Sequence, residues 1–222
     1  MKDLDASPVW RRLAADTEVK TYKGKRAFDV AAALAMCALF APVAVCAGAM
    51  VWRQSGRPIV FKHRRVGLGG QSFDVYKFRS MVRDADARLA ELLKTDAHAA
   101  KEWAESHKLK NDLRVTAIGR FLRKTSLDEL PQIINVLKGE MSLVGPRPVV
   151  AEELEKYDAS LPYYLACKPG LTGLWQISGR SDLAYSERVA LDVEYARTQS
   201  FLKDVAIALK TAKVLLKDRS AY

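Results

Sequence analysis

Cysteine and histidine are scarce in this chain, and neither residue has the spacing of a metal site. Over 222 residues there are three of each, namely Cys37, Cys46, Cys167, His63, His98 and His107. Two of the cysteines lie in an apolar run, which indicates buried thiols in a reducing compartment. The histidines form neither a catalytic triad nor a zinc pattern. We therefore expect no zinc centre and place the histidines at structural or exposed positions.

Several nucleotide- and nucleic-acid-binding signatures are also missing. The glycine cluster at 67–70 does not spell G-x-G-x-x-G and lacks a strand-to-helix setting, so it predicts a turn. The sequence has no RNP-like aromatic stretch, helix-turn-helix, internal repeat or long low-complexity linker. The net charge of +10 and the pI near 9.5 still indicate anionic partners, which could be nucleic acid, a membrane surface or phosphorylated substrates. Because the basic residues flank an apolar run, we do not expect nucleic acid.

That apolar run, Val30–Trp52, carries no charged residue and is long enough as a helix to cross a bilayer. Two features argue against a simple crossing. Pro42 lies in the middle of the run, where an interior proline costs about 3 kcal/mol or forces a kink. Lysine and arginine flank both sides, so the positive-inside rule predicts that both flanks are cytoplasmic. We predict a re-entrant hairpin that enters one leaflet, breaks at Ala41–Pro42 and returns.

We expect the chain to divide into a basic and polar N-terminal segment (1–24), a re-entrant membrane helix (25–56) and a cytosolic domain with membrane-interface helices (57–222). The predicted fold class is α+β and mostly helical. Within the cytosolic domain the patterns predict a small β-hairpin over 59–66 and 72–78, a long helix or helix pair over 84–110, a helix over 149–164 that stops near Pro162, a loop over 169–173 and a basic amphipathic helix over 201–217.

Two adjacent carboxylates, Asp128 and Glu129, lie inside this basic chain. Together with Ser126 they spell a capping box, but a proline would then interrupt the first full helical turn. A helix over Pro131–Lys138, closed by Gly139, avoids this conflict and leaves both acids just outside its N-terminus. The helix dipole and main-chain N–H groups would favour the ionised acids there, which suits a nucleophile or a metal ligand. Simple capping and a functional role are both open from spacing alone.

Four stretches of the sequence, taken in order, resemble the monotopic bacterial phosphoglycosyl transferases, also called bacterial sugar transferases. They are Phe73–Met81, Arg114–Gln132, Asn135–Pro148 and Lys168–Arg180. With the apolar run they cover the chain from about Lys23 to the C-terminus. The size, with no added N-terminal membrane bundle, is most similar to the short exopolysaccharide-production members. Many members have serine before the hairpin proline, where this chain has alanine.

The resemblance implies transfer of a hexose 1-phosphate, galactose or glucose, from a UDP-sugar to undecaprenyl phosphate with release of UMP. It implies that Asp128 is the nucleophile of a phosphosugar-aspartyl intermediate and that Glu129 helps to hold Mg²⁺ against the diphosphate. Residues 57–222 would then form the catalytic domain, with its active site at the cytoplasmic face of the cytoplasmic membrane. Phospholipid would be a further partner, and a homodimer is left open.

Cations near the acid pair are the candidate phosphate ligands. Lys77 and Arg79 alternate along a predicted strand and therefore share one face, although surface solvation would explain them as well. Arg123 precedes the acids, and Arg147 is stiffened between two prolines, where its planar guanidinium can meet phosphate. We expect the first three of these cations to pair with Asp128 when no substrate is bound.

Two other functions are compatible with the same residues. In one, the chain is a membrane-attached scaffold or regulator whose acid pair only caps a helix. In the other, it is a metal-dependent glycosyltransferase that moves the sugar alone. The released nucleotide separates the three hypotheses, because a glycosyltransferase releases UDP, a phosphoglycosyl transferase releases UMP and a scaffold releases neither.

Overall fold

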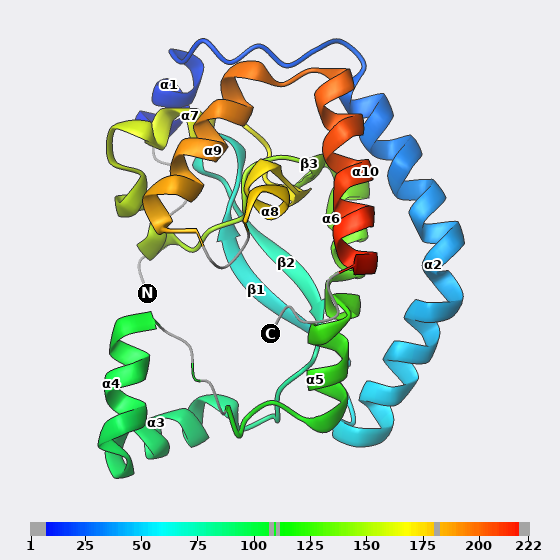
Figure 1. Cartoon of the computed structure of the whole chain (residues 1–222), viewed down its shortest axis with the longest axis vertical. Coiled ribbons are helices and arrows are strands. Elements are labelled where there is room, and N and C mark those ends of the chain that lie inside the picture. The colour runs from blue at the N-terminus through cyan, green and yellow to red at the C-terminus, as the bar shows by residue number, and fades with distance from the viewer. Residues whose placement is uncertain (1–7, 107–108, 110–111, 180–182, 218–222) are drawn as a thin grey trace.

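The computed structural model describes residues 8–106, 109, 112–179 and 183–217, and this part of the chain is mostly helical (Figure 1). Its α-helices are α1 (Pro8–Ala15), α2 (Lys25–Ser55), α3 (Ala85–Thr95), α4 (Ala97–Ser106), α5 (Ala117–Lys124), α6 (Gln132–Lys138), α7 (Leu161–Leu165), α8 (Leu174–Ser178), α9 (Tyr185–Thr198) and α10 (Phe201–Lys217). The strands and 3₁₀ segments are β1 (Val60–Val66), η1 (Leu68–Gly70), β2 (Ser72–Phe78), η2 (Leu127–Glu129), β3 (Ser142–Val144), η3 (Ala151–Ser160) and β4 (Gly170–Thr172). The α+β class is confirmed. Arg180, the last residue of the fourth motif, lies outside the described residues.

Helix α2 differs from the predicted hairpin. It continues as one helix through Ala41 and Pro42, and it bows along one side of the molecule without reversing direction (Figure 1). Proline removes only one main-chain donor and its fixed φ is helical, so the surrounding residues can keep the helix intact around a bend. The predicted break at Ala41–Pro42 is therefore absent from this structure.

Only the ends of α2 are buried against the rest of the protein. Ala33 near its start and Ala47 and Val51 near its end are each 1% exposed, whereas Leu39 and Val45 between them are 71% exposed. Of the most apolar 18-residue stretch of the helix, 11% is buried. The core helix of a soluble protein would be mostly covered, so the apolar middle of α2 calls for another apolar environment.

Buried charges fix the start of α2 to the C-terminal helices. Lys25 Nζ donates to Asp204 Oδ2 of α10 at 2.6 Å, and Tyr195 of α9 donates to the other oxygen of Asp204 at 2.8 Å. Asp29 accepts hydrogen bonds from the Ser142 hydroxyl at 2.9 Å and from the Leu143 main-chain N–H at 3.0 Å. Because buried charges are costly unless they are paired, this network fixes how α2 leaves the globular part.

The β-hairpin forms where the sequence predicts it. Strands β1 and β2 pair antiparallel from Val60 with Phe78 to Val66 with Ser72. The glycine cluster makes the turn, and Gly70 has φ 77° with the Trp10 ring so close that an added Cβ would lie 2.5 Å from it. Only glycine combines that backbone angle with that contact, so α1 packs directly on the turn.

The second sheet, the parallel pair β3–β4, is not predicted by the sequence. It joins Ser142 to Gly170 and Val144 to Thr172, within a stretch whose glycines and proline predict only a loop. An added Cβ on Gly170 would lie 2.1 Å from the main-chain nitrogen of Gly145. The glycines therefore serve a close approach of two backbone segments, which is a tertiary requirement that short-range patterns do not reveal.

The remaining helical predictions are partly confirmed. The polar stretch after β2 forms a helix pair, α3 and α4, and the amphipathic helix α10 has the predicted bounds. The predicted helix over 149–164 is confirmed only in part: most of the segment is helical, but η3 is a 3₁₀ helix kinked at Asp158 (φ 42°), and Pro162 lies in the first turn of α7, where the prediction ended the helix. Proline at that position starts a helix more readily than it stops one. α10 buries Ile207 against β3 and leaves Leu202 78% exposed.

Candidate active site

The acid pair lies in the 3₁₀ turn η2, between α5 and α6. Ser126 before it has φ 56°, in the left-handed region, and its side chain makes no capping hydrogen bond. Pro131 is the N-cap of α6, and Gly139 ends the helix with φ 82°. The capping-box interpretation is thus wrong, and the predicted proline start and glycine stop of α6 are confirmed to within one residue.

Asp128 is buried, with 8% of its surface exposed. Burial raises the pKa of its carboxyl to about 6, the charge of Glu129 also raises it, and the charges of Lys77 and Arg123 lower it. The sequence predicted that the helix terminus would favour the ionised acid. Desolvation outweighs that effect, because α6 is short and the carboxylate has lost most of its water. Perturbation of this kind is typical of functional carboxyl groups.

Lys77 connects the β-hairpin to the acid pair. Its Nζ donates to Glu129 Oε1 at 2.7 Å, and both side chains are about a third exposed. The sequence predicted a pair with Asp128, but the ammonium group forms its hydrogen bond with the neighbouring acid. Its charge still acts on Asp128. Lys77 therefore hydrogen-bonds the carboxylate of Glu129 and lowers the pKa of Asp128 through its charge.

Arg123 reaches the same region from α5. Its Nε donates to the Ser80 hydroxyl at 2.9 Å, just beyond β2. α5 approaches this point so closely that an added Cβ on Gly119 would lie 1.9 Å from the main-chain oxygen of Ser80. Thr116 caps α5 by accepting from the Gly119 N–H at 2.9 Å. These contacts fix the guanidinium group of Arg123 at a position from which its charge lowers the pKa of Asp128.

Asn135, which the sequence analysis did not single out, holds α6 against β2. It is fully buried, accepts from the Tyr76 main-chain N–H at 3.1 Å and donates to the Asp74 main-chain oxygen at 2.7 Å. Its second amide hydrogen bonds Glu140 at 2.7 Å. The side-chain amide thus pairs with the main chain of β2 as a neighbouring strand would. It therefore fixes the position of α6, which follows Asp128, relative to Lys77 on β2.

Among the described residues, none of the four predicted phosphate ligands forms a side-chain hydrogen bond or ion pair with Asp128, so the predicted pairing of Lys77, Arg79 and Arg123 with that acid is not seen. Arg79 follows β2, and the charge of Arg83 acts on it and lowers its pKa. The Arg147 guanidinium stacks over the Trp175 ring at 5.4 Å, and Arg188 lies at the same distance from that ring. Arg147 therefore lies in a separate aromatic and basic cluster at α8 and α9.

Arg65 lies between the region of Lys77 and the cluster around Arg147, and the sequence analysis did not identify it as a candidate site residue. With His63 it shares the face of the hairpin that carries Lys77, because their cross-strand partners Phe73 and Val75 alternate with that lysine. Burial lowers the pKa of Arg65, and the charge of Arg147 lowers it further. Burial and the charges of Arg65 and Lys77 lower the pKa of His63 to about 4. The alternation of His63 and Arg65 along β1 was the signal available in the sequence. Only the register of β1 against β2 shows that these two residues lie on the same face as Lys77.

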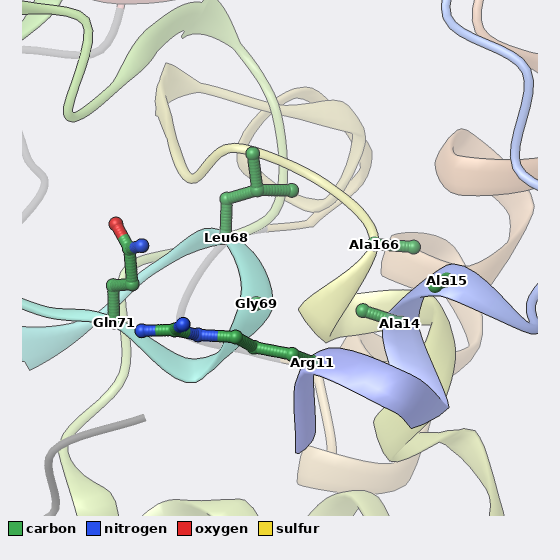
Figure 2. A pocket seen from close by; sticks show the side chains of 7 residues that line it. All are labelled: Arg11, Ala14, Ala15, Leu68, Gly69, Gln71 and Ala166. Atoms are coloured by element: carbon green, nitrogen blue, oxygen red, sulfur yellow. The ribbon is translucent and has the colours of Figure 1, made fainter. Parts of the chain in front are cut away.

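A surface hollow lies away from these residues. It has a volume of about 340 Å³ and is formed by α1, the β1–β2 turn and Ala166, with the Arg11 side chain extending across it toward Gln71 (Figure 2). None of the acid-pair residues or nearby cations lines it. This hollow therefore has no part in the candidate site.

The acid pair offers a small oxygen donor set for a cation. Among the described residues no cluster of three or more histidine, cysteine, aspartate or glutamate side chains could form a complete metal cage. Adjacent Asp128 and Glu129 nevertheless fit Mg²⁺, which commonly takes one or two carboxylates and completes its shell with phosphate oxygens and water.

Comparison with known proteins identifies the class. Residues 20–218 match the bacterial sugar transferase family, so the chain belongs to that family. It is 50% identical over 198 residues to the undecaprenyl-phosphate galactose phosphotransferase of Salmonella typhimurium, an alignment that covers 89% of this chain and 41% of that protein.

Two further relatives differ in length. The chain is 48% identical over 198 residues to the exopolysaccharide production protein ExoY of Rhizobium meliloti, covering 89% of this chain and 88% of that protein. It is 38% identical over 207 residues to the UDP-glucose:undecaprenyl-phosphate glucose-1-phosphate transferase of Caulobacter vibrioides, covering 89% and 72%. The chain thus spans less than half of the Salmonella relative but most of ExoY, and the resemblance found in the sequence is confirmed.

Proposed function

We propose that this protein transfers a hexose 1-phosphate, galactose or glucose, from a UDP-sugar to undecaprenyl phosphate, releases UMP and so initiates an exopolysaccharide repeat unit. The observation that carries the proposal is the buried Asp128 carboxyl beside Glu129, within the field of Lys77 and Arg123. The names of the Salmonella and Caulobacter relatives, which specify galactose and UDP-glucose, support a hexose donor and this lipid acceptor.

In the first half of the reaction an oxygen of Asp128 attacks the phosphorus next to the sugar. A bond forms between that oxygen and phosphorus, the bond to the bridging oxygen breaks, and UMP leaves with the electron pair. Although burial raises its pKa to about 6, Asp128 is mostly ionised at pH 7. Because the carboxylate is poorly hydrated, little water must be removed before attack.

In the second half, a phosphate oxygen of the lipid attacks the same phosphorus. The bond to Asp128 breaks, the carboxylate is restored, and the lipid carries a diphosphate joined to the sugar. Covalent catalysis of this kind divides one difficult displacement into two. It also requires the nucleotide and the lipid phosphate to have access to the same carboxylate from adjoining sites.

The charged residues neutralise the phosphates in this proposal. Glu129 would hold Mg²⁺, which neutralises charge on the donor diphosphate. Lys77, Arg123 and Arg147 would bind phosphate oxygens of the donor, and Arg79 is a further phosphate ligand outside that set. The Lys77–Glu129 contact then holds both groups in place before substrate arrives.

Helix α2 supports a location at one face of the membrane, and in this proposal its basic flanks make that face the cytoplasmic one. Its start binds Asp204, and at its end Gln54 accepts from the Ile118 main-chain N–H at 3.2 Å, so both ends contact the same globular part. A simple crossing would put one end on the far side of the bilayer, away from that part. We propose that the exposed middle of α2 lies in one leaflet as a curved re-entrant helix, with the exposed apolar residues of α10 near the interface.

The test is an assay of nucleotide release by the purified full-length protein with UDP-galactose or UDP-glucose, undecaprenyl phosphate and Mg²⁺. UMP release that requires Asp128 supports the proposal. UDP release would instead identify a glycosyltransferase, and no nucleotide release from well-folded protein would favour a scaffold. Asp84→Asn, which removes an exposed carboxylate on the loop before α3, is the matched control and should keep full activity.

A further inference from the structure

Arg79 has an unsatisfied hydrogen-bonding group just beyond β2. Its main-chain N–H donates to Ile59 at 2.9 Å, which extends the strand pairing by one residue. Its guanidinium Nη1 is buried and has no hydrogen-bond partner among the described residues. A buried donor without a partner is destabilising, and a charged one more so, which makes this atom a candidate ligand-binding group.

A second guanidinium group, that of Arg83, lies close enough to Arg79 for its charge to act on it. Arg83 donates from Nε to the Ser55 main-chain oxygen at 3.1 Å and from Nη2 to the main-chain oxygen of Arg57. These two hydrogen bonds hold its side chain against the C-terminal end of α2. Burial and the charge of Arg83 both lower the pKa of Arg79. Within the described residues, Arg79 has no carboxylate partner. Two neighbouring like charges of this kind favour a bound anion.

The adjoining end of α2 is apolar and accessible. Trp52 is 60% exposed, and a hollow of about 400 Å³ is lined by Ala49, Trp52 and Arg53. Figure 1 shows that this end of α2 lies next to α5 and the open end of the β-hairpin. An anion site at the exposed end of an apolar helix suits an amphiphile with a phosphate head and a hydrocarbon chain.

We infer that Arg79 and Arg83 bind the phosphate head of the lipid acceptor, at a site separate from the donor site at Lys77 and the acid pair. This inference rests on the proposed function and assigns its second substrate. Residues 77 and 79 are about 7 Å apart along the extended strand. Ser80 next to Arg79 bonds Arg123, whose charge acts on Asp128. The two phosphate sites are therefore neighbours on one structural element.

The two half-reactions test the assignment. Without lipid, the enzyme should release about one equivalent of UMP per active site, and Arg79→Gln should keep the amplitude and rate of this burst within about twofold. With undecaprenyl phosphate, Arg79→Gln should raise the KM for the lipid by about tenfold or more, because a charge-assisted contact to phosphate is lost. Arg79→Lys should give a smaller increase, since it keeps the charge but not the fork of donors.

Arg57→Gln is the matched control, because it removes the same charge at the same helix end while the Arg57 side chain is exposed. It should leave both half-reactions unchanged. An equal loss of the UMP burst in Arg79→Gln, or an unchanged KM for the lipid, would overturn the assignment. Thermal unfolding of each variant in detergent identifies any loss that comes from misfolding, and Arg79→Lys then provides the second test.

Direct binding separates this inference from the proposed reaction. Binding of undecaprenyl phosphate, undecaprenol and inorganic phosphate to the full-length protein in nanodiscs can be measured without turnover. We expect the lipid phosphate to bind, its alcohol to bind at least about tenfold more weakly, and Arg79→Gln to remove the difference. Inorganic phosphate that binds equally well would show a general anion site and contradict a lipid site. Lipid-phosphate binding without any UMP burst would refute the proposed reaction while retaining this site.

Discussion

Lys77 on β2 donates a hydrogen bond of 2.7 Å to Glu129 in η2, and this contact brings the β-hairpin to the acid pair. Because both side chains are about a third exposed, the ion pair itself adds little to stability. Its importance is geometric. It places one cation beside Glu129 and within the field of the buried Asp128, although 52 positions separate the two partners in the sequence.

Asp128→Asn should abolish activity while making the protein more stable at neutral pH. The raised pKa means that the folded protein binds this proton more tightly than the unfolded chain. The contribution of Asp128 to stability is therefore present below pH about 4 and is lost as pH rises to about 6. We expect at least about a thousandfold loss of UMP release. We expect a gain of roughly 1 to 3 kcal/mol at pH 7.5 that disappears near pH 4, measured by unfolding in detergent. A loss of stability at pH 7.5 would show that the carboxylate has a structural role.

The pH dependence of the UMP burst should report the ionisation of Asp128. Only the carboxylate attacks, so the rate should rise through pH about 6 and level off above it. Lys77→Met should shift the rise to higher pH, because the lysine charge lowers the pKa of Asp128. Glu129→Gln should shift it to lower pH, because the glutamate charge raises that pKa. Shifts in the same direction would contradict this electrostatic arrangement.

Asn135→Leu should destabilise the joint between α6 and β2. The change leaves the Asp74 oxygen, the Tyr76 N–H and Glu140 without their amide partner, at a cost of roughly 3 kcal/mol or more in unfolding free energy. Ile134→Ala, at the adjacent exposed position, is the control and should cost less than about 1 kcal/mol. Equal effects of the two substitutions would exclude the proposed anchoring role of Asn135.

Cysteine labelling should place both ends of α2 on the cytoplasmic side. Single cysteines at Lys23 and Arg57 flank the helix, and we expect neither to react with a membrane-impermeant reagent added outside intact cells. Both should react after the cells are opened. The native Cys167 should stay unlabelled in the folded protein, because it is 5% exposed and burial raises its pKa to about 12. External labelling at either flank would show that α2 crosses the bilayer.

Local chemistry predicted much of the site. The proline and glycine that bound α6, the turn of the hairpin and the alternation of Lys77 with Arg79 were readable because each depends on neighbouring residues. The ionisation of Asp128 was not, because desolvation depends on α5, α6 and β2 packing around it. The sequence predicted that Lys77 would pair with Asp128, whereas it pairs with Glu129. That choice also depends on how β2 packs against η2, which short-range patterns do not show.

The sequence by itself determined the apolar run, the adjacent carboxylates and the motifs of the bacterial sugar transferase family. Each of these is a property of composition or short spacing. Only the tertiary structure decided that α2 is one curved helix held at both ends by the same globular part, and that Arg79 lies within the field of Arg83 without an acid partner among the described residues. Such relations join distant segments through burial and charge, and those forces act only once the chain has folded.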